Sequence, residues 1–243
     1  MTTLEFSNQF DVLVSSYTRF RGFDGREPRD TIEFDEYEKS LYLTKAQEEL
    51  VKGLYTGKNQ FGESFEQTEE LRRYLASLIE EAELSPIITS DGKPLGMESN
   101  SKFFTLPPDC WFITYEGVII SDGKCESTSS IQVIPVRQDE YHKLKKNPFR
   151  GANDHRALRL DLSEGNVEIV SKYTVTKYYL RYLKKLNPII LVNLPNDVSI
   201  DGRNKSQTCE LHESLHQHIL EMAVMMALQS KGYTIDNKSN ENK

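Results

Sequence analysis

The segment His212–His216 carries the residue types of a zinc enzyme at the spacing that such an enzyme needs. Its sequence, His-Glu-Ser-Leu-His, matches the pattern H-E-x-x-H. In that pattern two histidines one helical turn apart bind zinc, and the glutamate activates a water molecule. The segment therefore raises the hypothesis of a zinc-dependent hydrolase, with His212 and His216 as ligands and Glu213 as the general base.

The neighbouring sequence weakens this hypothesis. A catalytic zinc needs a third protein ligand, but Ile219 and Met222 stand where the extended metzincin pattern has glycine and histidine. The downstream acids are Glu221, too close on the same predicted helix, and Asp236 and Glu241 in a polar tail. The motif also lies where a helix should begin, and polar residues there ordinarily cap the first turn. Three interpretations of the segment stay open: a hydrolase site, adventitious metal binding at the surface, and ordinary residues at a helix start. We expect the helix start, with no catalytic residue, metal or cofactor.

The cysteines give no stronger signal. Cys209 and His218 extend the histidine cluster, but the spacing does not match a closed zinc site and no second cysteine pair exists. Cys110 and Cys125 would lie far apart along a predicted hairpin, so we expect no disulfide between them. Three cysteines without a close pair indicate a reducing compartment.

Two basic segments stand out in an otherwise acidic chain. One comprises Lys143, Lys145, Lys146, Arg150, Arg156 and Arg159, with Pro148-Phe149 inside it. This segment is interpreted as a solvated loop, a contact with an acidic subunit face, or a contact with DNA phosphates. The other is a charge-mixed loop whose cations are Arg19, Arg21, Arg26 and Arg29. It is either a solvated loop or an inter-subunit contact.

The overall composition limits the classes of function. The chain has 243 residues, a charged fraction of 28% and a net charge of -7, which counts against a protein whose main task is to grip nucleic acid. No apolar run approaches membrane-spanning length, and the N-terminus lacks the regions of a signal peptide. We therefore expect a soluble intracellular protein that does not contact a membrane.

Helices are predicted at both ends of the chain. The first has Phe6, Phe10, Leu13 and Tyr17 in phase. The second runs from Phe34 to Gly57, with Thr44-Lys45-Ala46-Gln47 as a capping box, and the third from about Phe65 to Ala82. The last begins near His212 or Glu213 and ends at Gly232. On it Met222 and Met226 fall on the apolar face, where methionines fill gaps in a core or an interface.

The middle of the chain has the pattern of a β-meander. Strands are predicted near residues 102–106, 110–120, 131–136, 158–162, 167–169 and 173–183, with turns at Asp122-Gly123 and Glu164-Gly165-Asn166. They would form an antiparallel sheet of four or five strands. The fold class is then α+β, with the long terminal helix packed on the sheet. We expect one domain over residues 1–235 (helices to about 85, sheet from about 100 to 195, terminal helix from about 212 to 231) and a disordered tail over 236–243.

Three segments together resemble a known family. They are residues 34–51, 179–191 and 209–224, and they resemble the head-to-tail connector (ring or adaptor) proteins of crAss-like tailed bacteriophages, which are podoviruses. The resemblance covers the helical first third and the last sixty residues, and the middle matches in order and character only.

This resemblance implies a structural subunit rather than an enzyme. Such a subunit is made in the host cytoplasm, repeats around a ring of twelve-fold symmetry at the head-tail junction, docks beneath the portal and passes DNA through its bore without sequence-specific binding. The interface candidates under this interpretation are Arg19, Arg21, Arg26, Arg29, Lys143, Lys145, Lys146, Arg150, Met222 and Met226. The acidic excess and the charge-mixed loops agree with side-by-side contacts around a closed ring.

Overall fold

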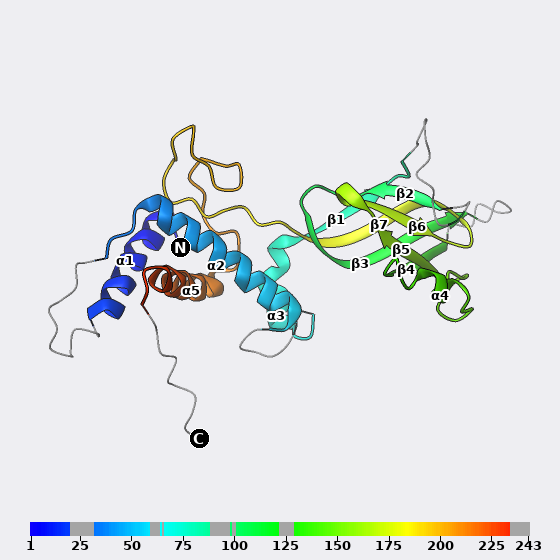
Figure 1. Ribbon diagram of the computed structural model, residues 1–243, viewed down its shortest axis with the longest axis horizontal. Coiled ribbons are helices and arrows are strands. Elements are labelled where there is room, and N and C mark those ends of the chain that lie inside the picture. Colours follow the sequence, from blue (N-terminus) through cyan, green and yellow to red (C-terminus); the bar gives the residue numbers. More distant parts are fainter. Residues whose placement is uncertain are drawn as a thin grey trace, which may run out of the picture. The chain divides into compact units, whose positions relative to one another are not determined.

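The computed structural model describes residues 1–19, 32–58, 64, 66–87, 98, 101–121 and 129–233, and it divides into two compact units. The first combines Met1–Ser77 with the segment from Leu186 onward, and the second is Leu78–Lys185 (Figure 1). We call them the helical unit and the sheet unit. In the described ranges, no helix combines the length and apolar character needed to cross a bilayer.

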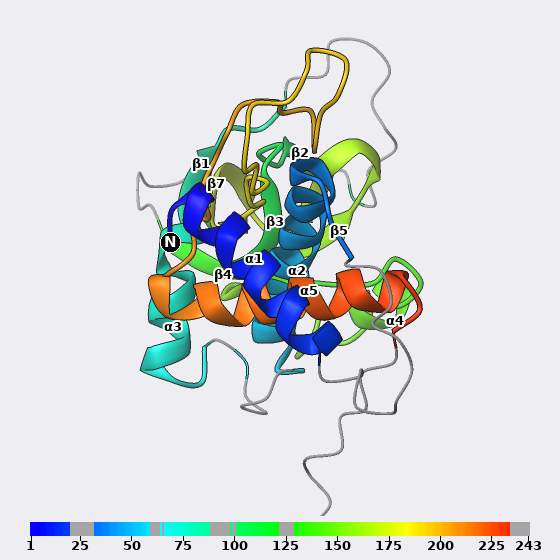
Figure 2. The same cartoon turned by 90° about the vertical axis from the view of Figure 1, so that its left-hand side faces the viewer.

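The helical unit is built from α1 (Thr3–Arg19), α2 (Glu36–Thr56), α3 (Glu69–Leu75) and α5 (His216–Ser230). Two short 3-10 turns, Ala76–Leu78 and Glu213–Leu215, follow α3 and precede α5. Helix α5 contacts both α2 and α1, and Figure 2 shows it lying across them. The fully buried side chains of this unit include Phe6, Phe10, Leu43, Leu54 and Ile219.

The packing of α5 corrects one expectation from the sequence. The fold class is α+β as predicted, but the terminal helix packs on α1 and α2 rather than on the sheet. An amphipathic pattern shows only that one face of a helix is buried, and the partner may be a sheet or other helices. Here the packing partner of α5 is the pair of apolar faces on α1 and α2.

Helix α2 begins earlier than its capping-box pattern predicted. Asp35 is the N-cap: its side chain accepts a hydrogen bond from the Glu38 backbone, and Glu38 bonds back to the Asp35 N–H. Thr44 and Gln47, expected to form the capping box, lie inside the helix. The predicted end is correct, because Gly57 adopts the left-handed conformation (φ 74°) that closes a helix.

The polar residues inside α2 bind a distant segment instead. The Leu191 N–H donates to Ser40 Oγ (3.0 Å), and the Ile189 N–H donates to Thr44 Oγ1 (3.1 Å). Gln47 Nε2 donates to the Asn187 carbonyl at 2.9 Å. We call these three side chains the polar stripe of α2. They form hydrogen bonds to the backbone of an extended segment that joins no strand of the sheet, and buried backbone groups need such partners.

The sheet unit holds seven strands in the order β1-β7-β3-β4-β5-β6-β2. Their bounds are Ile79–Leu84 (β1), Lys102–Thr105 (β2), Cys110–Ser121 (β3), Ser129–Pro135 (β4), Arg156–Asp161 (β5), Asn166–Val170 (β6) and Thr174–Lys184 (β7). All neighbours pair antiparallel except β4 and β5, which are parallel and are joined through α4 (Tyr141–Lys145). The two ends of the unit meet, because Ile79 on β1 pairs with Leu183 on β7.

Several strand predictions are confirmed and one helix prediction is wrong. Tyr178, Leu180 and Tyr182 share the buried side of β7, and β5 pairs antiparallel with β6. Strands β3 and β4 also pair as expected, although their predicted turn at Asp122-Gly123 and Cys125 lie outside the described residues. The third helix ends at Leu75, because after the 3-10 turn Ala76–Leu78 the chain forms β1, which pairs with β7.

Candidate functional site

The zinc-like segment forms the start of α5. His212 is the N-cap of the turn Glu213–Leu215, and its Nδ1 accepts a hydrogen bond from the Ser214 N–H at 3.3 Å. His216 begins the α-helix proper. These residues therefore have the geometry of an ordinary helix start.

Both ring nitrogens of His216 are engaged inside the helical unit. Nδ1 lies 2.7 Å from the Met1 amino group, and Nε2 lies 3.0 Å from the Leu211 carbonyl oxygen. The amino group donates and the carbonyl accepts, so the neutral ring carries its proton on Nε2. Burial lowers the pKa of His216 below its ordinary value, which keeps the ring neutral. A zinc ligand needs a free nitrogen lone pair, and His216 offers none.

The other candidate metal ligands do not converge. Burial raises the pKa of the Cys209 thiol to about 11, so it is protonated at neutral pH and is a poor ligand. Within the described ranges, no three His, Cys, Asp or Glu side chains are grouped so that they could hold a metal ion. The segment that most resembled a catalytic motif is a structural junction between α5 and the first residues of the chain.

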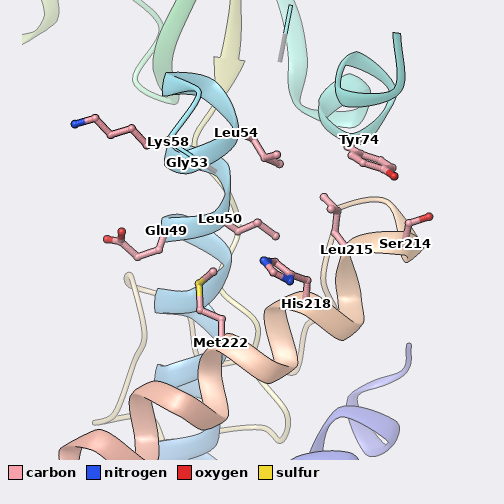
Figure 3. Close-up of a pocket in the computed structure, with 10 residues that line it drawn as sticks. All are labelled: Glu49, Leu50, Gly53, Leu54, Lys58, Tyr74, Ser214, Leu215, His218 and Met222. Carbon is pink, nitrogen blue, oxygen red and sulfur yellow. The ribbon is translucent and has the colours of Figure 1, made fainter. Parts of the chain in front are cut away.

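A hollow of about 340 Å³ lies in the helical unit (Figure 3). Leu50 and Leu54 reach into it from α2 toward Leu215 and His218 at the start of α5. Its lining residues are Glu49, Leu50, Gly53, Leu54, Lys58, Tyr74, Ser214, Leu215, His218 and Met222. We call this hollow the helical pocket. Sequence reasoning missed it, because its walls come from three helices distant in the chain; of its lining residues, Met222 was among the interface candidates.

A second hollow, of about 520 Å³, lies on the sheet unit beside β1, β7 and β3. Tyr115 is half-exposed there, and the charged side chains around it are already paired. Arg181 Nε lies 2.7 Å from Glu81, and Lys177 binds Glu83. This hollow therefore presents no unpaired charge to a partner, unlike the basic segment of the same unit.

The basic segment is split by the structure into paired and unpaired cations. Lys145 forms an ion pair with Glu98 at 2.5 Å, and Arg159 is buried. Lys143, Lys146 and Arg150 are exposed, and none has an acidic partner among the residues that the structure describes. These three cations are therefore available for a contact.

A fixed turn holds Phe149 among these cations. Asn147 Oδ1 accepts hydrogen bonds from the N–H groups of Phe149 (2.9 Å) and Arg150 (3.3 Å). Arg156 donates to the Phe149 carbonyl at 2.9 Å. At Gly151 a Cβ atom would lie 3.0 Å from two backbone carbonyl oxygens, so the turn leaves no room for a side chain. We call residues 147–150 the Phe149 tip.

The structure describes only some of the remaining interface candidates. Met222 and Met226 are half-buried on α5, which agrees with gap-filling packing. Arg21, Arg26 and Arg29 lie outside the described residues, as does the side chain of Arg19.

A buried ionic cluster inside the sheet unit was not anticipated. Arg159 on β5 donates to Glu116 on β3 at 2.5 Å, and Tyr178 on β7 donates to the other carboxylate oxygen at 2.7 Å. Burial raises the pKa of Glu116, while Arg159 and Tyr178 act in the opposite direction. The available signal was Glu116, the single charged residue within the otherwise uncharged strand β3. The cluster ties three strands together and lines neither of the two hollows described above, which indicates a structural role.

The exposed aromatic and unpaired cations of the sheet unit and the apolar hollow of the helical unit are surfaces suited to binding a protein partner. The chain belongs to the phage tail ring protein 3/4 family, whose model matches residues 1–239.

Two relatives come from Bacteroides phage crAss001. The chain is 45% identical over 241 residues to its "Ring protein 3", covering 98% of this chain and 100% of the relative. It is 29% identical over 236 residues to "Ring protein 4/5", covering 93% and 92%. The resemblance to crAss-like ring proteins is thereby confirmed. The protein is a structural component of the virion, a member of an oligomeric ring in the phage tail, and not an enzyme.

Proposed function

We propose that this protein forms a closed ring at the head-tail junction, docked beneath the portal, and that the ring forms part of the passage for DNA. The full-length similarity to a ring protein carries this proposal. From the resemblance of the sequence to head-to-tail connector proteins, we further propose that the ring contains twelve copies. The two-unit fold supports it as well, since each unit offers the neighbouring copy a different surface.

The charge distribution supports a passage that does not hold DNA. The chain has a net charge of -7, so its average surface repels phosphates. The unpaired cations of the sheet unit are concentrated near the Phe149 tip. We assign Lys143, Lys145, Lys146 and Arg150 to contacts between proteins, together with Arg19, Arg21, Arg26, Arg29, Met222 and Met226.

Electron cryo-microscopy of virions that carry this chain tests the proposal. We expect density for the chain in a twelve-fold ring that touches the portal. A ring further down the tail would overturn the portal contact, and another rotational order would overturn the copy number. Native mass spectrometry of the purified protein gives an independent count of subunits in any closed assembly.

A DNA-retention assay tests whether the assembled ring holds DNA. We expect the assembled ring to retain no duplex DNA at about 150 mM salt, where surface charges are screened beyond roughly 8 Å. Neutralising Lys143, Lys145 and Lys146 should then change nothing. Salt-sensitive retention that falls on neutralisation would instead assign these residues to DNA.

A further inference from the structure

The Phe149 tip has the properties of a binding anchor. Phe149 is 84% exposed, more than any other large apolar side chain among the described residues. The Asn147 side chain and Arg156 fix the backbone on both sides of it. A backbone that is already ordered before binding loses little conformational entropy on binding, and aromatic side chains dominate the energetics of many interfaces.

The charges around this ring restrict its partner. Lys143, Lys146 and Arg150 lie within six residues of Phe149 along the chain and have no acidic partner in the described parts of the chain. The partner surface should therefore present an apolar hollow with acidic groups at its edge.

The helical pocket has both properties. Leu50, Leu54, Leu215 and Met222 provide apolar walls, and its volume of about 340 Å³ is ample for one aromatic side chain. Methionine also contacts aromatic rings favourably and adapts to their shape. Glu49, which also pairs with Lys52 at 3.6 Å, is one of the lining residues, and Tyr74 in the wall bonds to a further carboxylate, that of Glu70. Lys58 is the only lysine or arginine among the described lining residues.

We propose that Phe149 of one copy inserts into the helical pocket of a neighbouring copy, with Lys143, Lys146 and Arg150 of the first copy against Glu49 and Glu70 of the second. This inference rests on the proposed ring and specifies its subunit contact. The two surfaces differ and belong to the same chain, so the contact is heterologous. Repetition of such a contact closes a ring when the rotation between copies allows it.

A second copy is the occupant that these features favour over DNA. Phosphates would be attracted by the cations but would gain nothing from an apolar pocket on the same chain. Aromatic side chains bind nucleic acid by stacking on unpaired bases, and a DNA duplex does not present unpaired bases.

Site-specific photo-cross-linking tests the contact directly. A benzophenone amino acid replaces Phe149 in the full chain, and labelled (¹⁵N) and unlabelled copies are mixed before illumination. We expect cross-linked peptides that pair position 149 with Met222 or Leu54 and that contain one heavy and one light partner. The same photoreactive residue at Tyr115, which is half-exposed on the same unit, is the control and should not reach the pocket.

The outcomes of this experiment separate the possibilities. Links confined to single copies, links to another surface, or no links would overturn the contact. Links to an added DNA duplex would assign the tip to nucleic acid. A twelve-fold ring in virions without these links would leave the proposed function standing and remove only this contact.

Substitutions give a second, quantitative measurement. We expect Phe149→Ala to weaken self-association at least tenfold in analytical ultracentrifugation, and Tyr115→Ala to leave it unchanged. Lys146→Glu with Arg150→Glu should also weaken it, and Glu49→Lys should restore part of the loss. Unchanged association in Phe149→Ala would overturn the proposal; circular dichroism verifies that each variant is folded.

Discussion

Among the residues that the structure describes, the helical unit and the sheet unit each bury one cation, but they surround it differently. Lys39 on α2 binds Asp11 and Glu36 at 2.7 and 2.9 Å, and these side chains are 55% and 36% exposed. Arg159 and Glu116 in the sheet unit are only 10% and 7% exposed. The carboxylates around Lys39 can return to water if their partner is lost, whereas Glu116 cannot. The same type of ion pair should therefore carry different energetic weight in the two units.

Removing the cation of the sheet unit should have the largest effect. Arg159→Met leaves a buried carboxylate unpaired, and we expect the free energy of unfolding to fall by about 3–5 kcal/mol. Urea denaturation followed by fluorescence of Trp111, the single tryptophan, reports on this unit. The double variant Glu116→Leu with Arg159→Met should lose less than the single one. A single variant that loses under about 1 kcal/mol would contradict the comparison.

The polar stripe of α2 should come next. Thr44→Val keeps the side-chain shape but leaves the Ile189 N–H without its partner, and we expect a loss of about 2 kcal/mol. Hydrogen exchange of the amides of residues 187–192 should accelerate correspondingly. Thr56→Val on the same helix is the matched control, since its hydroxyl bonds only to the exposed Lys52 carbonyl, and it should change stability by under about 0.5 kcal/mol.

Removing the cation of the helical unit should have a smaller effect. Lys39→Met leaves Asp11 and Glu36 accessible to water, so we expect a loss of about 1 kcal/mol, which hydrogen exchange in α1 and α2 measures. Lys45→Met on the exposed side of α2 serves as the control. A loss as large as that of Arg159→Met would show that exposure does not explain the difference between the units.

The pH dependence of the helical unit should be the smallest of these effects. Burial lowers the pKa of His216, so the unfolded chain takes up a proton at a higher pH than the folded unit does. Stability is therefore fully present above a pH of about 6.5 and falls as the pH drops toward the folded pKa. Met1, Glu213 and His212 act on the same ring. The pH slope of amide exchange in α5 should flatten in His216→Gln; an unchanged slope would assign it to other groups.

The sequence predicted the elements better than their long-range partners. The α+β class, the strand pattern of β7 and the end of α2 follow from local periodicity and turn residues. Thr44 and Gln47 were misplaced, because the capping pattern is local and their true partners lie 145 and 140 residues away. Strand β1 was assigned to a helix, because Leu78 and Ile79 continue a helical phase that pairing with β7 overrides.

The candidate sites show the same limit. The zinc-like segment was correctly placed at a helix start, and the basic segment was singled out from charge alone. The helical pocket and the Glu116 cluster could not be assembled, because each joins side chains from elements far apart in the chain. The expectation of one domain over residues 1–235 stays a prediction, which the number of unfolding transitions tests.

The pairing of Ile79 with Leu183 makes the sheet unit an insertion whose two ends are adjacent. The chain leaves the helical unit after Ser77 and returns to it at Leu186. On the ribosome, α1 and α2 must therefore wait for more than a hundred residues of sheet before α5 emerges to cover them. Because antiparallel partners lie about 5 Å apart, a short linker could replace the whole insertion. Evolution could likewise exchange the sheet as a cassette and leave the helical frame intact.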